Sequence, residues 1–264
     1  MAFALGLRAR EAGYRLAAHE SVESTNATAL SLVRSGEQGP LWVVTRLQTA
    51  GRGRRGRAWS SGEGNLAASL LTTTHVAPAS AATLGFVAGL ALDDALRSCA
   101  PGAKIALKWP NDVLLDGRKL AGILLEAESR PDGLALVVGI GVNLASAPEG
   151  LPFPATSLAA RGFIVHPKVM FAALTDAWSG FERLWDGGRG MPRIRELWLQ
   201  RAAGLGETVS VSMGDRVVEG IFETLDNDGQ MILRGTDGSK IAVAAGEVHF
   251  GAAATLRDPA KGCH

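Results

Sequence analysis

The pattern of apolar and polar positions begins with two strand-like runs separated by a helical one. Residues 14–19 predict a first strand, and residues 41–47 form a continuous apolar run rich in β-branched residues, which is typical of a buried strand. Between them, hydroxyl and amide side chains from Ser21 to Asn26 stand where a helix cap is needed. The helix that they begin is predicted to end at Gly36.

The middle of the chain continues with further strands and one long helix. A strand is predicted from Leu66, followed by a loop-bounded helix over 77–99 whose apolar residues recur at helical spacing. Three or four adjacent strands follow within 105–144. They are broken at Asp-Gly pairs, 116–117 and 132–133, which are hairpin signals.

The last third changes from a helical pattern to a strand pattern. Two more helices are predicted over 167–186 and 191–203, which completes an α+β fold in which helices pack on one side of a mixed sheet. After Gly204 the chain alternates short strand runs with Gly, Asp and Asn turns, as in a small β-barrel. We therefore expect three parts along the chain: 1–204, a barrel over 205–251, and a tail over 252–264.

Composition narrows the class of protein. The chain of 264 residues has 27 Lys and Arg against 26 Asp and Glu, a formal charge of +1, which argues against a histone-like or polybasic membrane-surface protein. Only Cys99 and Cys263 are present, so neither a disulfide scaffold nor a zinc site held by His and Cys is expected. No run predicts a secretory core or a membrane helix, and a cytoplasmic protein is expected.

One loop concentrates positive charge that the whole-chain total conceals. Between residues 46 and 57 the chain has five arginines, three glycines and no acid, a local charge of +5. These residues are Arg46, Arg52, Arg54, Arg55 and Arg57, with Gly51, Gly53 and Gly56. Glycines let backbone N–H groups approach an anion, and arginine forks suit phosphate or carboxylate oxygens. The loop therefore predicts an anion site.

Other interpretations of this loop are weaker. Its glycines formally match the GxGxxG dinucleotide fingerprint, but no helix begins after it and no acid follows at the distance a ribose needs. An Arg/Gly nucleic-acid segment would bring more repeats or aromatic residues. A solvated basic loop would leave five arginines without partners. A small-molecule phosphate clamp, without a P-loop, is favoured.

Three ordered segments give the loop a family context. GRGRRGRAW (51–59), KWPNDVLLDGRKLAGILLE (108–126) and VVGIGVNL (137–144) together resemble the catalytic domain of biotin protein ligases. ESTNATAL (23–30) resembles that family's biotin-side helix start, and residues 205–250 resemble its SH3-like barrel. The resemblance implies a class II synthetase-like fold and ATP-dependent activation of biotin as biotinyl-5'-AMP, followed by transfer to a carrier lysine.

The resemblance also implies roles for individual residues. Arg54, Lys119 and Asp112 match catalytic positions, with Arg54 and Lys119 contacting carboxylate and phosphate oxygens and Asp112 as a hypothetical base for the incoming lysine. The implied biotin-binding residues are Ser24, Thr25, Asn26, Gln48, Gly51, Arg52, Gly53, Arg54, Lys119, Gly122 and Ile123. The implied ATP and adenylate residues are Arg52, Arg54, Arg55, Arg57, Trp59, Asn111, Lys119 and Asn143.

Cofactor and partner follow from the same resemblance. ATP with Mg²⁺ is expected, the ion near Asn143, and biotin is a substrate. The expected partner is the biotin carboxyl carrier domain of acetyl-CoA carboxylase or a related carboxylase. Because only 13 residues precede Tyr14, we expect no DNA-binding domain and no DNA or membrane partner. For the oligomeric state, a homodimer is kept as an alternative to a monomer. The alternatives are a lipoate or octanoate ligase or transferase of the same fold, and a single-stranded nucleic-acid-binding protein.

Overall fold

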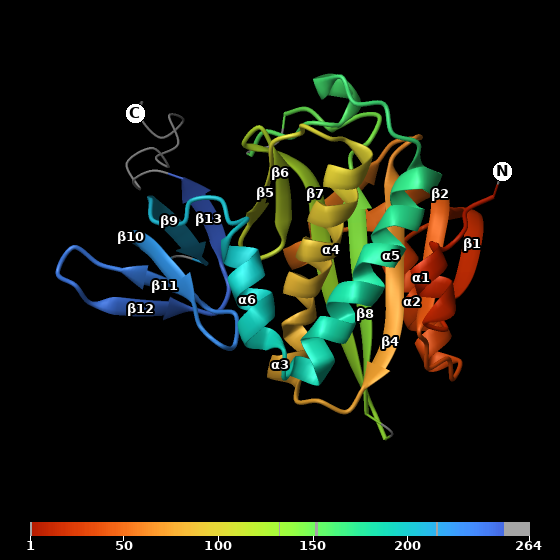
Figure 1. Ribbon diagram of the computed structural model, residues 1–264, viewed down its shortest axis with the longest axis horizontal. Helices are drawn as coiled ribbons and strands as arrows, with labels where there is room; N and C mark the ends of the chain where they lie inside the picture. Colours follow the sequence, from red (N-terminus) through yellow and green to blue (C-terminus); the bar gives the residue numbers. More distant parts are fainter. Residues whose placement is uncertain (1, 132, 151–152, 215, 251–264) are drawn as a thin grey trace, which may run out of the picture.

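Two β-sheets organise the computed structural model, which describes residues 2–131, 133–150, 153–214 and 216–250. Figure 1 shows the large sheet behind two long helices, with the small sheet beside it. The large sheet has the strand order β1-β2-β4-β8-β7-β6-β5, and β3 pairs with β2. Its strands are β1 (Arg15–Val22), β2 (Leu41–Arg52), β3 (Ala58–Ser61), β4 (Leu66–Thr74), β5 (Ile105–Lys108), β6 (Asp112–Leu115), β7 (Arg118–Arg130) and β8 (Gly133–Val142).

The large sheet is mixed, as predicted. β1 and β2 pair in parallel, and the other strand pairs are antiparallel. A parallel pair needs a crossover, which here is a helix beginning at the Ser24 cap, where the Ser24 hydroxyl accepts from the backbone N–H of Ala27. The helices are α1 (Leu7–Glu11), α2 (Thr25–Arg34), α3 (Pro78–Ala82), α4 (Leu84–Cys99), α5 (Pro167–Trp185) and α6 (Met191–Leu199).

Both faces of the large sheet are packed, but unequally. Along β2, Trp42 and Val44 lie in the main core with helices α4 and α5, whereas Leu41 and Val43 lie in a smaller cluster with α2. Alternate residues of a strand point to opposite faces, so α4 and α5 cover one face and α2 part of the other. The predicted helical layer is confirmed, and α2 adds a short helix opposite it, which leaves the rest of that face free for a site.

Three elements differ from the sequence expectation. The helix predicted over 77–99 is divided at Thr83, whose hydroxyl donates to the carbonyl of Ser80 and accepts from the Trp185 indole N–H at 2.7 Å. No strand was predicted between residue 47 and Leu66, but β2 extends to Arg52 and strand β3 pairs back on it. The last predicted helix ends at Leu199 because the following backbone pairs with β5 through Leu107.

Within the described residues, one helical stretch is long and apolar enough to cross a membrane by length and composition. It runs over Pro78–Cys99, and 72% of its most apolar window is buried inside the protein. That burial identifies it as the core helix against which α5 and the sheet pack, because a helix that is apolar on most sides must be covered.

The small sheet is antiparallel, with the order β12-β11-β10-β9-β13. Its strands are β9 (Thr208–Met213), β10 (Arg216–Leu225), β11 (Met231–Arg234), β12 (Lys240–Val243) and β13 (Glu247–Phe250). It joins the large part through the turn between β10 and β11, where the Gly229 carbonyl accepts a hydrogen bond of 3.0 Å from the Trp109 indole N–H. The division at residue 204 stays a prediction, and the expected tail, 252–264, lies outside the described residues.

Candidate active site

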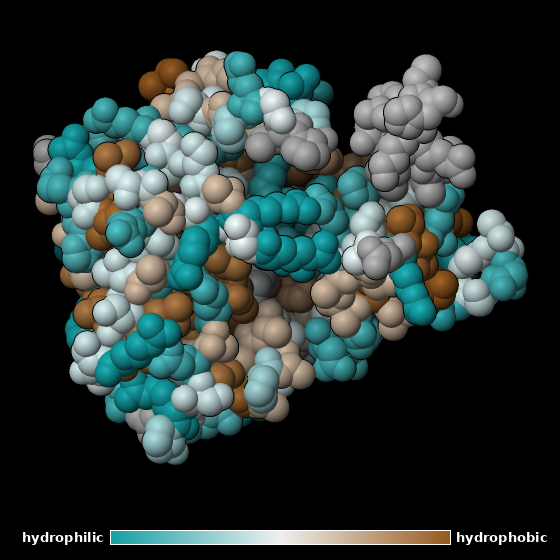
Figure 2. Space-filling model, turned by 180° about the vertical axis from the view of Figure 1, so that it is seen from behind, coloured by the Kyte–Doolittle hydropathy of each residue, from teal (hydrophilic) through white to brown (hydrophobic). Residues whose placement is uncertain are grey.

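A cavity of about 570 Å³ opens on the face of the large sheet that carries α2 and extends to the small sheet. Figure 2 shows this face, with a hollow that has hydrophilic groups around it and hydrophobic groups within. Sixteen of the predicted site residues line the cavity: Ser24, Thr25, Asn26, Gln48, Arg52, Gly53, Arg54, Arg55, Arg57, Trp59, Asn111, Asp112, Lys119, Gly122, Ile123 and Asn143. Gly51 lies just behind this lining, where a side chain would overlap the Gln48 amide and the Trp59 carbonyl.

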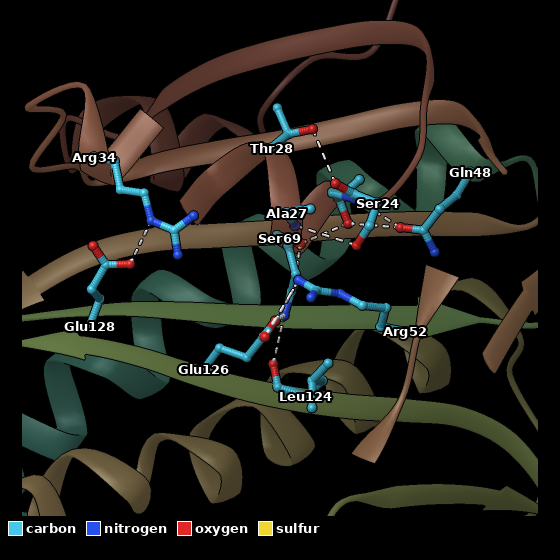
Figure 3. A network of polar contacts seen from close by, with 12 residues as sticks. Ser24, Ala27, Thr28, Arg34, Gln48, Arg52, Ser69, Leu124, Glu126 and Glu128 are labelled. Atoms are coloured by element: carbon cyan, nitrogen blue, oxygen red, sulfur yellow. Dashed lines mark hydrogen bonds and ion pairs between the residues drawn. The ribbon is translucent and has the colours of Figure 1, made fainter. Parts of the chain in front are cut away.

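A buried polar cluster forms one end of the cavity (Figure 3). Gln48 Oε1 accepts from the backbone N–H of Thr25 at 2.9 Å, which ties β2 to the first turn of α2. Ser69 Oγ on β4 lies 2.7 Å from Thr25 Oγ1 and 2.6 Å from Asn26 Oδ1. The Asn26 amide nitrogen donates to Glu126 Oε2 at 2.7 Å. Ser69 and Glu126 were not predicted, because only the sheet brings them beside α2.

Two alternate glycines of β8 make room for the side chains of Asn26 and Trp59. A Cβ at Gly139 would overlap the Asn26 amide, and one at Gly141 would overlap the Trp59 indole. Gly122 on the neighbouring strand lies opposite Gly141 and also faces Trp59. These glycines are therefore the floor on which the amide and the indole rest. Their signal in the sequence is the G-I-G pattern inside an apolar run, since glycine within a strand marks a close approach.

The arginine loop forms the tip of the hairpin between β2 and β3. It contains a 3₁₀ turn, η1 (Arg54–Gly56), in which Arg55 adopts a left-handed conformation with φ of 57°. Arg54 reaches inward and donates to Asn111 Oδ1 at 2.8 Å. Burial lowers the pKa of Arg54 below its usual value, and the neighbouring Arg55 charge adds to the effect. A buried guanidinium beside other cations favours a bound anion.

Lys119 and Asp112 form an ion pair on adjacent strands at the cavity wall. Lys119 Nζ lies 2.7 Å from Asp112 Oδ1, and 5.7 Å from the centre of the Trp59 ring. Both side chains are partly buried. The pair places a compact positive charge beside the indole and fixes its position, which a flexible exposed lysine would not do.

Lys108 is a cation of this cavity that the sequence reasoning missed. It is only 4% exposed, and its Nζ lies 3.6 Å from the centre of the Phe153 ring. Burial lowers the pKa of Lys108 to about 8, while Asp112 opposes this effect. The sequence does contain a signal, because a lysine within a buried strand is unusual. Lys108 was passed over because it stands in the motif KWPND, where other residues received the functional assignments.

The small sheet also contributes to the cavity, through Gly246, Glu247 and Val248. Glu247 on β13 accepts two hydrogen bonds from Arg57, at 3.1 and 2.6 Å. The Arg57 hydrogen bonds hold the pKa of Glu247 below its usual value. No local pattern could predict this contact, because the two residues are 190 positions apart.

Asn143 is the predicted residue with an unused acceptor. It is buried at the end of β8, its Nδ2 donates to the Thr156 carbonyl at 3.2 Å, and its Oδ1 has no hydrogen-bond partner among the described residues. In the part of the chain that the structure describes, no three His, Cys, Asp or Glu side chains are grouped so as to hold a metal ion. A lone amide oxygen does fit Mg²⁺ that is carried mainly by phosphates and water.

Known proteins show the same order of parts. Residues 18–143 match the biotin/lipoate A/B protein ligase family, and residues 204–251 match the biotin protein ligase C-terminal domain. A biotin–[acetyl-CoA-carboxylase] ligase of Paracoccus denitrificans is 45% identical over 237 residues, which cover 87% of this chain and 98% of the relative.

Solved structures agree. The fold is similar to that of a biotin protein ligase from Aquifex aeolicus in complex with biotin and ATP, with a TM-score of 0.76, 26% identity, and coverage of 90% of this chain and 99% of that one. It is also similar to a biotin protein ligase from Leishmania major in complex with biotinyl-5-AMP, with a TM-score of 0.62, 25% identity, and coverage of 88% and 98%. With a relative of such identity spanning nearly its whole length, the chain belongs to the biotin protein ligase family.

Proposed function

We propose that this protein activates biotin with ATP to give biotinyl-5'-AMP and transfers the biotinyl group to a lysine of a carrier domain. The observation that carries the proposal is the content of one cavity. A buried set of hydroxyl and amide groups lies at one end, and Arg54, Lys108 and Lys119 line the same cavity. A substrate with a polar ring at one end and a carboxylate at the other, brought against a triphosphate, needs this combination.

The polar end suits the cyclic urea of biotin. That ring presents one carbonyl and two N–H groups, so it needs both donors and acceptors within otherwise apolar walls. Ser24 and Thr25 supply hydroxyl groups there, and Gln48 supplies an amide nitrogen, since its amide oxygen already accepts from Thr25. Ile123 and Gly122 supply apolar wall. The Asn26 amide is occupied by protein partners, so we assign it to holding the set in place rather than to direct contact.

The cationic end suits the reacting groups. Biotin carboxylate and ATP are both anions, and two unit charges at about 4 Å repel by roughly 4 kcal/mol at an effective dielectric of 20. Arg54 and Lys119 are placed to offset this repulsion, with Arg52, Arg55 and Arg57 around them. We assign Lys108, which is buried deeper, to the leaving pyrophosphate. Trp59 is proposed to cover the adenine and exclude water.

The first step forms a bond between a carboxylate oxygen of biotin and the α-phosphorus of ATP, and breaks the bond from that phosphorus to the bridging oxygen. Negative charge builds on the oxygens around phosphorus and on the leaving pyrophosphate. Cations that are already fixed stabilise this charge without reorganising. The hydrogen bond from Arg54 to Asn111 and the ion pair of Lys119 with Asp112 provide that fixation.

The second step transfers the acyl group. The neutral amine of the carrier lysine attacks the acyl carbon, the bond to the AMP oxygen breaks, and the amine loses a proton. We propose Asp112 as the acceptor of that proton, directly or through water. Its ion pair with Lys119 holds the carboxylate in position at the cavity wall, while Lys119 stays beside the departing phosphate. Mg²⁺ bound with ATP would screen phosphate charge, and Asn143 Oδ1 is the group proposed to hold it.

One assay tests the proposal. Purified protein, biotin, ATP, Mg²⁺ and a carboxyl carrier domain should yield biotinylated carrier, read by streptavidin blot. Arg54→Ala and Lys119→Ala should each lose at least about a hundredfold in rate, the typical effect of removing a transition-state charge contact. Asp112→Asn should slow transfer from pre-formed biotinyl-adenylate. A parent protein that produces no biotinylated carrier, but transfers octanoate or lipoate, would replace the proposal with the second substrate class.

The partner and its specificity belong to the same proposal. The carrier domain of acetyl-CoA carboxylase is the proposed acceptor, which is supported by the similarity to the biotin–[acetyl-CoA-carboxylase] ligase of Paracoccus denitrificans. We keep three predictions that nothing above tests: a cytoplasmic location, no DNA contact and no membrane contact. The homodimer stays an alternative to the monomer.

A further inference from the structure

Glu126 is not among the predicted site residues, yet its carboxylate contacts both Asn26 of the polar cluster and Arg52 of the arginine loop. It stands on β7, with a side chain that is 28% exposed. One carboxylate oxygen accepts from Asn26 Nδ2 at 2.7 Å. Arg52 Nη2 of the arginine loop lies 3.5 Å from each carboxylate oxygen. Figure 3 shows the Glu126 side chain next to Arg52, below the cluster that includes Ser24 and Ser69.

The contact with Glu126 determines which way the Asn26 amide points. A carboxylate can only accept, so the Asn26 nitrogen must face it, and the second proton of that nitrogen is directed at the Leu124 carbonyl, 3.4 Å away. The Asn26 oxygen is then turned to Ser69 Oγ at 2.6 Å. Because the two ends of an amide are nearly equal in size, packing alone does not select this orientation, and the charge of Glu126 does.

The fixed amide in turn orders the hydroxyl protons. Ser69 has one hydroxyl proton and two neighbours, Asn26 Oδ1 and Thr25 Oγ1. The amide oxygen has no proton to offer, so the Ser69 proton is needed there and is not given to Thr25. The Thr25 hydroxyl directs its own proton to Ser69 Oγ at 2.7 Å or to Gln48 Oε1 at 3.2 Å. Thr25, which lines the cavity, is left with a free lone pair. A lone pair there accepts from an N–H of the ligand.

We infer that Glu126 is a positioning residue for urea recognition: it orders the protons of Asn26, Ser69 and Thr25 so that an acceptor faces an N–H of the substrate's cyclic urea, and its pair with Arg52 links this order to the arginine loop. The inference rests on the proposed function. Glu126 does not touch the substrate, so its effect is on substrate affinity rather than on the chemical step.

The same strand supplies a matched control. Glu128 is two residues further along β7 on the same face, and it forms a 3.0 Å ion pair with Arg34 of α2. It has the same charge and the same kind of partner, and its side chain is 33% exposed. Its partner Arg34 does not line the cavity, whereas Asn26 and Arg52, the partners of Glu126, do. Glu128→Gln therefore removes a comparable ion pair without disturbing the proton order.

The test measures biotin binding by calorimetry without ATP, and steady-state rates of the full enzyme. Glu126→Gln should weaken biotin binding about tenfold, because the glutamine amide can present either end to Asn26. The KM for biotin should rise by the same factor, with kcat and the KM for ATP within about twofold. Desthiobiotin, which keeps the cyclic urea, should lose the same factor. Glu128→Gln should change none of these values.

A second test exchanges the charged and neutral side chains between positions 26 and 126. Asn26→Asp alone sets two carboxylates against each other and should weaken biotin binding about a hundredfold. In the double variant with Glu126→Gln, the carboxylate at position 26 accepts from Ser69 and from the new amide at position 126, which restores the proton order. The affinity of the double variant should return to within about threefold of the parent.

The outcomes separate the two hypotheses. If the parent biotinylates the carrier but Glu126→Gln binds biotin as tightly as Glu128→Gln, the inference is overturned and the proposed function stands. A double variant no better than Asn26→Asp would overturn it in the same way. A parent that binds no biotin would overturn both.

Discussion

Lys108 shows how a single residue can trade stability for function. An ordinary lysine has a pKa near 10.5, and burial lowers the pKa of Lys108 to about 8. Asp112 and Glu247 favour its charged form, while Lys119 opposes it. Between pH 8 and 10.5 the unfolded chain binds more protons at this residue than the folded one, so its contribution to stability rises with pH in that window. At neutral pH the buried ammonium destabilises the fold.

Lys108→Met should therefore raise stability while it lowers activity. We expect a gain on the order of 3 kcal/mol in the free energy of unfolding at pH 7, measured by urea denaturation, because the pKa shift represents that order of energy. The KM for ATP of the parent should increase as the pH rises through about 8, when the ammonium loses its charge. Lys108→Arg, which stays charged, should flatten that dependence. A parent profile already flat from about pH 7 to 9 would contradict the assignment to pyrophosphate.

Gly141 matters to the site because it has no side chain, which leaves room for the Trp59 indole. Gly141→Ala would push the Trp59 indole off the β8 floor, so we expect the KM for ATP to rise at least about tenfold with little change in biotin affinity. Gly180 of α5 is the control, since a Cβ there meets nothing within 4 Å. Gly180→Ala should keep full activity and add about 0.5–1 kcal/mol of stability. Equal kinetics in the two variants would mean that Trp59 does not cover the nucleotide.

At the level of elements, the arginine loop is held from outside its own hairpin. Arg57 joins the hairpin tip to β13 through Glu247, and the Arg57 side chain is 61% exposed. Exposed ion pairs contribute about 0–1 kcal/mol, so this pair cannot matter much for global stability. Its effect is on the position of a short loop, which is also held internally by backbone hydrogen bonds from Gly53 N–H to the Arg57 carbonyl and from Arg57 N–H to the Arg54 carbonyl.

The variant Glu247→Gln should separate the effect on global stability from the effect on the position of the arginine loop. The free energy of unfolding should change by less than about 1 kcal/mol, while proteolysis within residues 52–60 becomes faster in the absence of ligand. Biotin with ATP should protect the loop in both proteins, since charge-assisted bonds to the anions replace the lost one. Digestion that is equally fast in parent and variant would show that the loop is ordered without β13.

Local pattern predicted the elements better than their ends. The strands over 41–47 and from Leu66 were found because apolar runs mark buried strands whatever their neighbours are. The break at Thr83 was missed because its cause is the Trp185 indole, 102 positions away. Most cavity residues were found through the family resemblance. Glu247, Ser69 and Glu126 were missed, because their roles come from sheet pairing and the packing of two sheets, which leave no mark in the nearby sequence.

At the scale of the whole molecule, one buried carboxylate joins the parts that lie behind the site. Asp93 on α4 is fully buried, and its Oδ2 accepts from Arg97 Nε and from Arg201 Nε, each at 2.8 Å. Arg201 follows α6, and its carbonyl accepts from the backbone N–H of Leu107 on β5 at 2.7 Å. The carboxylate thus ties the core helix to the segment that leads from the large sheet to the small one.

Asp93→Asn should be among the most destabilising conservative changes in the chain. Removing one member of a buried ionic group leaves the others uncompensated, which costs about 3–5 kcal/mol. Asp94→Asn is the control, because Asp94 is half exposed and lies 3.5 Å from Arg201. Urea denaturation should show a change below about 1 kcal/mol for the control. Similar midpoints for the two variants would mean that Arg97 and Arg201 find other partners.

The cavity takes its walls from Ser24 near the start of the chain and from Val248 on the last described strand. The ribosome synthesises Ser24 early and Val248 late. The nascent polypeptide can therefore form its central sheet long before the cavity is complete. We therefore expect that a half-synthesised chain does not make the reactive mixed anhydride, which would escape into water from an incomplete site. The same geometry makes biotinylation a sensitive report of whether the whole chain has folded.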